Sequence, residues 1–394
     1  MSSPRPPSPY RPQNVTSRAL AGEPGPVRGR GAPDNPLGRF ERLAVIADPD
    51  DDPTLEAAPP DEDGEAAAEH AGQPRLATEL LRDTSRSIIA KNDSPDIPFD
   101  VSFNPYRGCE HGCVYCYARP THEYLGFSAG LDFETRILVK EDAPELLRKA
   151  LTAPSWVPQT LALSGVTDPY QPVERRLRIT RRCLEVLAEL RHPVAVITKN
   201  RLVTRDLDLL AELARHGAVV VALSVTTLDP ELAARMEPRA SHPRDRLRAI
   251  AEIAAAGVPA TVNVAPVVPG LTDHEIPAIL EAAAAAGATG AGWVPLRLPG
   301  AVAGLFERWL EEHYPERKEK VLARVREMRG GRLNDPRFGS RLRGEGVWAE
   351  QIRALFRGAR RRAGLEGPRP ELSTAAFRRP GEQLGLFGEG GGAG

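Results

Sequence analysis

The chain has 394 residues and a formal net charge of −1, and 41% of its residues are hydrophobic. This length allows one large domain or two ordinary ones, and the hydrophobic content is enough for a sizeable core. No apolar run is long enough to span a membrane, and the N-terminus lacks the apolar stretch of a signal peptide. We therefore expect a cytoplasmic protein whose cysteines stay reduced.

Residues 1–75 are predicted to be disordered. Pro, Gly, Ser and Arg dominate up to about residue 36, and residues 48–65 contain nine Asp or Glu but no Lys or Arg. Such a composition cannot bury enough apolar surface to offset the entropy of ordering the chain. A short apolar patch at 40–46 could dock or form a local element. The acidic run is best interpreted as a solvated linker, although it could also screen a basic surface or mimic nucleic acid.

From about residue 76 strands and helices alternate. The apolar runs predict strands at 99–103, 160–164, 194–198, 219–225, 260–264 and 290–296. Helical periodicity predicts helices at 144–151, 174–190, 204–216, 243–256 and 274–286, and residues 131–140 are expected to be extended. Short continuous apolar runs are typical of strands buried on both faces, and this alternation predicts parallel strands with helical crossovers. Six strands favour an α/β partial (βα)6 barrel over residues 76–310.

Three cysteines lie within eight residues, in a Cys-x3-Cys-x2-Cys spacing at Cys109, Cys113 and Cys116. Gly108 and Gly112 permit the tight turns that let so short a loop offer one thiolate to each of three irons of a cubane. The fourth iron would remain open for a ligand. These cysteines are too crowded to pair well as disulfides. A Cys3His zinc site that uses His111 remains an alternative.

With Tyr115 directly before the last cysteine, the segment reads Cys-x3-Cys-x-aromatic-Cys and resembles the radical S-adenosylmethionine (SAM) enzymes. Over residues 97–296 the chain is similar to the branch related to spore photoproduct lyase. The resemblance implies a partial (βα)6 barrel, a [4Fe-4S] cluster on the three cysteines, SAM at the open iron, and an electron donor such as flavodoxin or ferredoxin. The reduced cluster would cleave SAM to a 5′-deoxyadenosyl radical, which abstracts hydrogen from a substrate.

Polar residues follow successive predicted strands, at the carboxyl edge where chemistry gathers in α/β folds. The candidate cofactor-binding residues are Tyr115, Ser164, Asp168, Lys199, Ser224, Arg239 and Asn263. Lys199 and Arg239 would suit the methionine carboxylate of SAM. Many radical SAM enzymes have Gly-Glu after the second strand, where this chain has Ser164 and Gly165. Each candidate also has a structural alternative, with Asp168 as a helix cap, Ser224 as core filling and Lys199 in a solvated turn.

Cys183 falls within a predicted helix, where lone cysteines are usually small buried apolar residues. Spore photoproduct lyase uses an additional cysteine as a hydrogen donor. No cysteine stands at a strand end here to match it, so the resemblance does not carry over lyase activity itself.

The C-terminal region is basic. Residues 316–379 contain eighteen Lys or Arg and eight Asp or Glu, an excess of ten positive charges. Helices are predicted at 315–329 and 348–363, joined by an Arg- and Gly-rich connector at 334–346, so residues 311–379 form a basic helical extension. Such a surface attracts phosphates without reading sequence, which favours nucleic acid and a role in DNA repair. It could instead balance the acidic run or pack on the barrel.

The last stretch, residues 380–394, is predicted to be a flexible Gly-rich tail. Gln383, Leu384, Leu386 and Phe387 resemble the peptide by which bacterial proteins bind the replisome sliding clamp. The same apolar residues could dock back onto their own domain. Two other classes of protein stay open: a redox-sensing, nucleic-acid-binding or clamp-binding protein whose cluster does not cleave SAM, and a zinc-binding interaction module.

Overall fold

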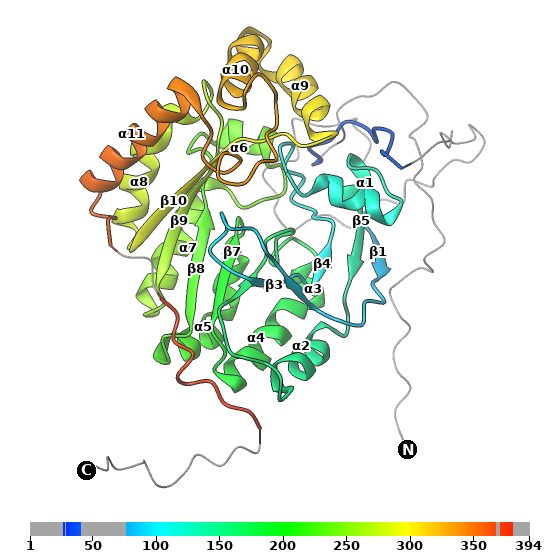
Figure 1. The fold of residues 1–394 in the computed structure, drawn as a ribbon, viewed down its shortest axis with the longest axis vertical. Coiled ribbons are helices and arrows are strands. Elements are labelled where there is room, and N and C mark those ends of the chain that lie inside the picture. Colours follow the sequence, from blue (N-terminus) through cyan, green and yellow to red (C-terminus); the bar gives the residue numbers. More distant parts are fainter. Residues whose placement is uncertain (1–26, 28, 41–75, 368–370, 381–394) are drawn as a thin grey trace, which may run out of the picture.

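The computed structural model describes residues 27, 29–40, 76–367 and 371–380 (Figure 1). Within them a seven-stranded sheet has the order β10-β9-β8-β7-β6-β3-β2. Its strands are β2 (Ile89–Lys91), β3 (Val101–Phe103), β6 (Leu161–Leu163), β7 (Val194–Thr198), β8 (Val219–Ser224), β9 (Ala260–Val267) and β10 (Gly290–Pro295). All neighbours pair in parallel except β2 and β3. The six predicted parallel strands are confirmed, and the sheet remains open between its edges β10 and β2.

Helices α2 (Ala143–Thr152), α4 (Ile179–Leu190), α5 (Leu207–Arg215), α7 (Pro243–Ala255) and α8 (Ile276–Ala285) pack against one face of this sheet (Figure 1). The short helix α3 (Glu174–Leu177) precedes α4, and α6 (Pro230–Met236) packs instead beside residues 113–115 and the C-terminal helices. Short 3-10 turns are η1 (Arg119–Leu125), η2 (Arg201–Asp206) and η3 (Asp273–Glu275). The predicted helix at 174–190 is broken because Arg178 adopts a left-handed conformation, with φ 52°. Cys183, on α4, is fully buried in the main core, as predicted.

The two faces of the sheet differ in burial. Along β7 and β8 the residues alternate between buried and half-buried, and the buried set, such as Val196 and Leu223, packs in the core. The alternate set, such as Ile197 and Ala222, faces the concave side. The expectation of strands buried on both faces is therefore wrong for these strands. Their inner face is accessible at the place where a partial barrel binds its ligands.

A smaller sheet, with the order β1-β5-β4, lies beside the first. It contains β1 (Glu79–Arg82), β5 (Arg136–Val139) and β4 (Tyr106–Arg107), and α1 (Leu131–Thr135) leads into β5. The prediction that 131–140 is wholly extended is thus wrong for its first half. Contacts distant in sequence decide this, since Asn35 accepts a hydrogen bond from the Asp132 N–H at 2.8 Å and donates one to its carboxylate at 3.0 Å.

Residues 29–40 differ from the expectation of a disordered N-terminal segment. Arg30 donates hydrogen bonds to the carbonyl oxygens of Glu134 and Leu76, both at 2.8 Å. Val27 and Ala32 are buried against Leu131 and Leu305. The segment is rich in Gly, Pro and Arg, and it is ordered by contacts with the folded domain instead of by a core of its own.

The C-terminal extension consists of α9 (Val302–His313), α10 (Pro315–Met328) and α11 (Gly346–Arg362). The helices expected near 315–329 and 348–363 are confirmed, whereas α9 was not predicted. In Figure 1 α11 lies along α8, and α9 and α10 form the end of the molecule nearest α6. Residues 383–387, the clamp-like peptide, lie outside the described residues. No helix in the described part of the chain is long and apolar enough to cross a membrane.

Candidate active site

The three cysteines of the Cys-x3-Cys-x2-Cys loop lie directly after β4. Cys109 and Cys113 are buried, Cys116 is half-buried, and all three are free thiols. Backbone hydrogen bonds fix the loop from two sides: the Cys109 N–H donates to the Phe133 carbonyl at 2.8 Å, and the Val114 N–H donates to the Met236 carbonyl at 3.1 Å. The loop is therefore held between α1 and the end of α6.

A fully buried arginine, Arg119, stabilises the same loop from inside. It donates to the carbonyl oxygens of Gly112 at 3.3 Å and Cys113 at 3.0 Å, and it forms a buried ion pair with Glu134 at 2.5 Å. The Glu134 carboxylate also accepts the N–H groups of Gly31 at 3.0 Å and Ala32 at 2.9 Å. The loop, α1 and the N-terminal segment thus share one buried hydrogen-bond network.

The chemistry of these thiols fits an iron–sulfur cluster. Burial raises the pKa of Cys109, Cys113 and Cys116 above the ordinary value of a thiol, and the nearby Asp168 and Glu237 raise those of Cys109 and Cys113 further. Thiolates at these positions need added positive charge, which iron ions supply. In the described residues no group of three or more His, Cys, Asp or Glu is gathered as around a single metal ion. A cubane instead distributes its thiolates over separate irons.

A buried carboxylate, Glu237, lies behind the loop. It pairs with Arg246, which is 1% exposed, and with Lys199 at 3.0 Å, and it accepts hydrogen bonds from Tyr115 and from Thr226, the latter at 2.6 Å. Although burial alone would raise the pKa of Glu237, the two cations and the hydrogen bonds hold it far below its usual range. One carboxylate shared by two cations leaves an excess of one positive charge beside Cys113.

Lys199 directly follows β7, as expected, but its ammonium is already fully engaged. Its Nζ donates to Thr226 Oγ1 at 3.0 Å and to the Ala265 carbonyl at 2.8 Å, in addition to the pair with Glu237. An ammonium has three N–H donors, so a carboxylate of SAM would have to replace one of these partners. The Nζ also lies 5.7 Å from the centre of the Tyr115 ring.

Asp168 connects the second and third strand ends. It accepts hydrogen bonds from Thr198 Oγ1 at 2.7 Å and from the Lys199 N–H at 2.8 Å, and it lies 3.4 Å from His111 Nδ1. Burial would raise the pKa of Asp168, but His111 and these hydrogen bonds lower it below its usual value. Asn200 is 3.1 Å from the other ring nitrogen of His111. Asp168 therefore positions the histidine of the cysteine loop.

The remaining predicted residues are brought together only in part. Ser224 on β8 pairs in register with Asn263 on β9. A Cβ on Gly292 would come within 2.9 Å of Asn263 Oδ1, so the side-chain amide of Asn263 lies over β10. The Ser164 hydroxyl donates to the Thr167 carbonyl at 3.0 Å. Arg239 pairs with Glu110 at 3.2 Å, behind the loop.

Sequence reasoning missed Arg119, Glu134, Glu237 and Arg246 as parts of this site. For Arg246 a signal existed. Ala249, Ile250 and Ile253 are buried residues of α7, and they follow Arg246 by three, four and seven positions. Arg246 is therefore a cation on the apolar face of an amphipathic helix. A charge at such a position needs a buried partner.

This loop, on an open parallel sheet with polar strand ends, defines the class of protein. The profile described as "Radical SAM superfamily" matches residues 103–283. The chain belongs to the radical SAM superfamily and is an enzyme of that type, which implies an iron–sulfur cluster and SAM.

The chain is also similar to two uncharacterized proteins and to one solved structure. An uncharacterized protein of Mycobacterium tuberculosis is 41% identical over 284 residues, which covers 71% of this chain and 80% of the relative. An uncharacterized protein of Methanocaldococcus jannaschii is 26% identical over 125 residues, 32% of this chain and 44% of the relative. The structure of a spore photoproduct lyase mutant has a TM-score of 0.51 and 17% identity, and the match covers 73% of this chain and 80% of that structure. This last similarity concerns the fold alone.

Proposed function

We propose that this chain binds a [4Fe-4S] cluster through Cys109, Cys113 and Cys116, cleaves SAM reductively, and acts on a nucleic acid. The observation that carries the proposal is the set of three free thiols in one clamped loop, two of them buried, with the cations Lys199 and Arg246 behind it. When bound and reduced, such a cluster supplies one electron to the SAM sulfonium, which yields methionine and a 5′-deoxyadenosyl radical. Flavodoxin or ferredoxin would be suitable electron donors.

The residues of the chain orient and shield this chemistry. Arg119 holds the backbone of the cysteine loop through its carbonyl oxygens. Lys199 and Arg246 favour the charged form of Cys113 without any rearrangement, because both cations are fixed in advance, whereas Glu237 between them opposes it. The row with Ser224 and Asn263 offers hydroxyl and amide groups on the accessible inner face, where they could hydrogen-bond the ribose or adenine of SAM.

The basic extension supports a nucleic-acid substrate. Helices α10 and α11 pack through apolar residues, including Val321, Val325 and Phe356, and leave most of their arginines on the outer side. Beside them an open cavity of about 550 Å³ is lined by Arg317, Lys320, Arg324, Trp348 and six other residues, which include the exposed Leu355 and one carboxylate, Asp273. The Arg324 guanidinium stacks on Trp348 at 3.6 Å. Cations and an aromatic ring around an open cavity suit a phosphate backbone.

One observation keeps a second function in view. The ammonium of Lys199 has no spare donor for SAM, which favours the alternative of a redox-sensing or nucleic-acid-binding cluster protein that does not cleave SAM. Binding of the sliding clamp through Gln383, Leu384, Leu386 and Phe387 stays a prediction from the sequence, and the comparisons give it no support.

One experiment separates these functions. The protein is reconstituted anaerobically with iron and sulfide, then incubated with SAM and dithionite, and 5′-deoxyadenosine is measured by chromatography. We expect each of Cys109→Ala, Cys113→Ala and Cys116→Ala to lose iron and product. Cys183→Ala is the matched control and should keep both, because Cys183 is buried in the core away from the loop. Protein that holds the cluster but neither binds nor cleaves SAM would favour the sensor.

A further inference from the structure

The segment that joins α10 to α11, residues 329–345, connects the two edges of the open sheet, and we call it the strap. At one end Arg329 donates to the carbonyl oxygens of Pro295 at 3.2 Å and Leu296 at 2.8 Å, directly at the end of β10. The same guanidinium donates to the carbonyl oxygens of Ser340 and Arg341 in the strap, at 3.2 and 2.6 Å. The strap is thereby attached to the last strand.

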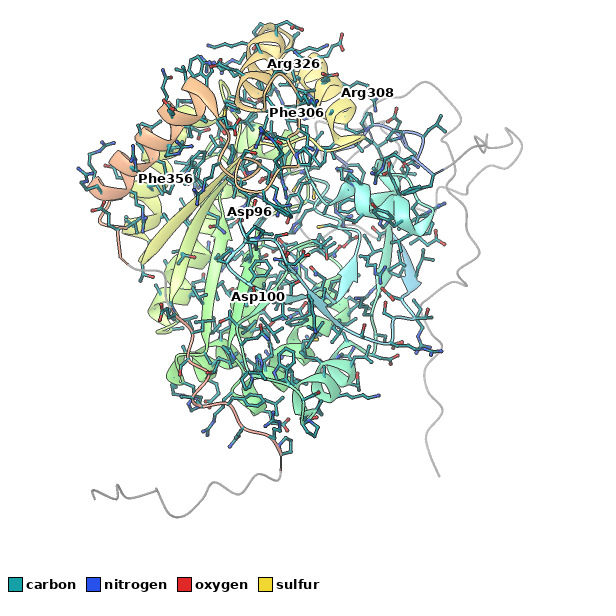
Figure 2. All side chains as sticks on the ribbon, in the orientation of Figure 1. Asp96, Asp100, Phe306, Arg308, Arg326 and Phe356 are labelled. Carbon is teal, nitrogen blue, oxygen red and sulfur yellow. The ribbon has the colours of Figure 1, made fainter. Side chains whose placement is uncertain are left out.

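Its other attachment is Asp96, which precedes β3 and is labelled near the middle of Figure 2. Asp96 accepts two hydrogen bonds from the Arg341 guanidinium, at 2.9 and 2.6 Å, and one from the Gly339 N–H at 3.1 Å. Asp96 lies in the loop between β2 and β3, and β2 is the edge of the sheet opposite β10, so the strap joins the last parallel strand to the β2–β3 hairpin.

Below the strap one cation lacks a counter-ion. Arg297 follows β10, and its guanidinium stacks at 4.3 Å on the ring of Tyr117, the residue after Cys116. Within the described parts of the chain it has neither a salt bridge nor a hydrogen bond. Burial lowers the pKa of Arg297; Tyr117 and Asp96 act against this shift, and the positive charge of Arg341 adds to it. The Asp96 carboxylate is not a direct partner of Arg297, because it accepts its hydrogen bonds from Arg341 and Gly339. By contrast, Lys199 and Arg239 each have a carboxylate partner.

A half-buried guanidinium without a partner is costly unless a ligand provides one. Arginine presents five N–H donors in a planar fork that matches the oxygens of a phosphate. The site opens to solvent, since Tyr117 is 44% exposed and its hydroxyl donates to the Gly165 carbonyl at the end of β6, at 2.5 Å. A ligand that enters from solution would meet Arg297 beside the cysteine loop.

We propose that Arg297 binds a phosphate group of the substrate at the mouth of the sheet, and that Tyr117 and the strap hold its guanidinium in position. This inference rests on the proposed function and adds to it the residue that would place the substrate beside the cluster loop. The phosphate could belong to a nucleic-acid strand or to a free nucleotide. The exposed Arg332 and Arg343 carry further positive charge on the strap, so a ligand with several phosphates gains additional attraction.

The test compares Arg297→Gln and Arg297→Lys with Arg182→Gln in the full-length, cluster-loaded protein. Arg182 is a suitable control because it is also half-buried but lies on the outer helix α4. Fluorescence anisotropy measures binding of a labelled single-stranded oligodeoxynucleotide over a range of KCl concentrations, and thymidine monophosphate is titrated as a competitor. SAM affinity and 5′-deoxyadenosine formation without substrate are measured in parallel.

We expect Arg297→Gln to weaken oligonucleotide binding roughly tenfold and to reduce the salt dependence by about one ion, because one phosphate contact is lost. Arg297→Lys should bind with intermediate affinity, and Arg182→Gln should match the wild type. Competition by thymidine monophosphate that depends on Arg297 would identify a single phosphate as sufficient. Competition by oligonucleotide alone would identify the strand as the source.

Three results would overturn the inference: wild-type protein that binds neither probe, Arg297→Gln protein with wild-type affinity for both, and a loss of SAM affinity with unchanged oligonucleotide binding. The last would assign Arg297 to the SAM carboxylate. Failure of the proposed function looks different. In that case wild-type protein forms no 5′-deoxyadenosine, while phosphate binding that depends on Arg297 would still support the site.

Discussion

Lys199 and Glu237 form an ion pair 3.0 Å long beneath the cysteine loop, although the two residues belong to different βα units. The Glu237 side chain is fully buried, and Arg246 shares the same carboxylate. Removing one partner of a buried pair leaves uncompensated charge, which costs far more than the loss of a surface pair.

Glu237→Gln should therefore destabilise the protein by about 3–5 kcal/mol, because it leaves both Lys199 and Arg246 without a carboxylate. Unfolding in urea measures this free energy. Glu252→Gln is the matched control, since Glu252 pairs with Arg201 at 2.8 Å near the surface. That change should cost at most about 1 kcal/mol. Equal effects of the two variants would mean that the buried network contributes no more than a surface pair.

Gly31→Ala should displace the N-terminal segment from the cysteine loop. A Cβ at this position would overlap the carbonyl oxygen of Gly112, which lies inside the loop, and backbone atoms there cannot move aside cheaply. We expect a loss of about 1–3 kcal/mol and a lower iron content after reconstitution. Gly304→Ala is the control: no heavy atom surrounds that site on α9, so the change should be neutral or stabilise the helix by roughly 0.5–1 kcal/mol. Unchanged melting temperature and iron content in the Gly31 variant would contradict this role.

His192 should make stability depend on pH. Burial lowers the pKa of His192 from 6.5 to about 4, and its ring accepts a hydrogen bond from Trp156 Nε1 at 3.1 Å. The unfolded chain binds a proton below about pH 6.5 while the folded chain does not, so stability falls as the pH drops from about 6.5 toward 4.

His192→Gln should reduce this dependence. Between about pH 7 and pH 5 the wild type should lose about 2 kcal/mol more stability than the variant, as measured by urea unfolding at both values. His274→Gln removes an exposed histidine and should keep the wild-type slope. Parallel pH profiles for His192→Gln and the wild type would show that the ring does not titrate as its burial requires.

Asp96→Ala should release the strap. Asp96 is only 9% exposed, and the Arg341 hydrogen bonds hold its pKa below the usual value of 3.8. Hydrogen bonds to charged groups contribute about 1.5–3 kcal/mol, so trypsin should cleave after Arg337, Arg341 or Arg343 at least about tenfold faster in the variant. Asp142→Ala breaks an exposed pair with Arg82 and should leave the cleavage rate unchanged. A strap equally resistant in both variants would mean that Asp96 is not its main attachment.

The sequence by itself determined the parallel strands and the cysteine loop. Strand β7 was predicted with its observed bounds, and five other parallel strands were predicted near theirs, because short apolar runs and the helices between them are local patterns. The cysteine loop was predicted in the same way, because the spacing of Cys109, Cys113 and Cys116 is a local pattern. The burial of Cys183 followed from its place within a predicted helix. Chain order alone placed Lys199 and Ser224 at strand ends.

Only the tertiary structure decided which groups meet. Glu237, Lys199 and Arg246 share charge because three separate elements converge behind the loop, and no local pattern records that convergence. Residues 29–40 are ordered by Glu134, about a hundred positions away. Asp96 and Arg341 are 245 positions apart, yet together they close the strap over Arg297. Periodicity and spacing along the sequence predict helices, strands and the cysteine loop. The pairing of buried charges depends on how those elements pack against one another. This pairing determines the electrostatic environment of the site.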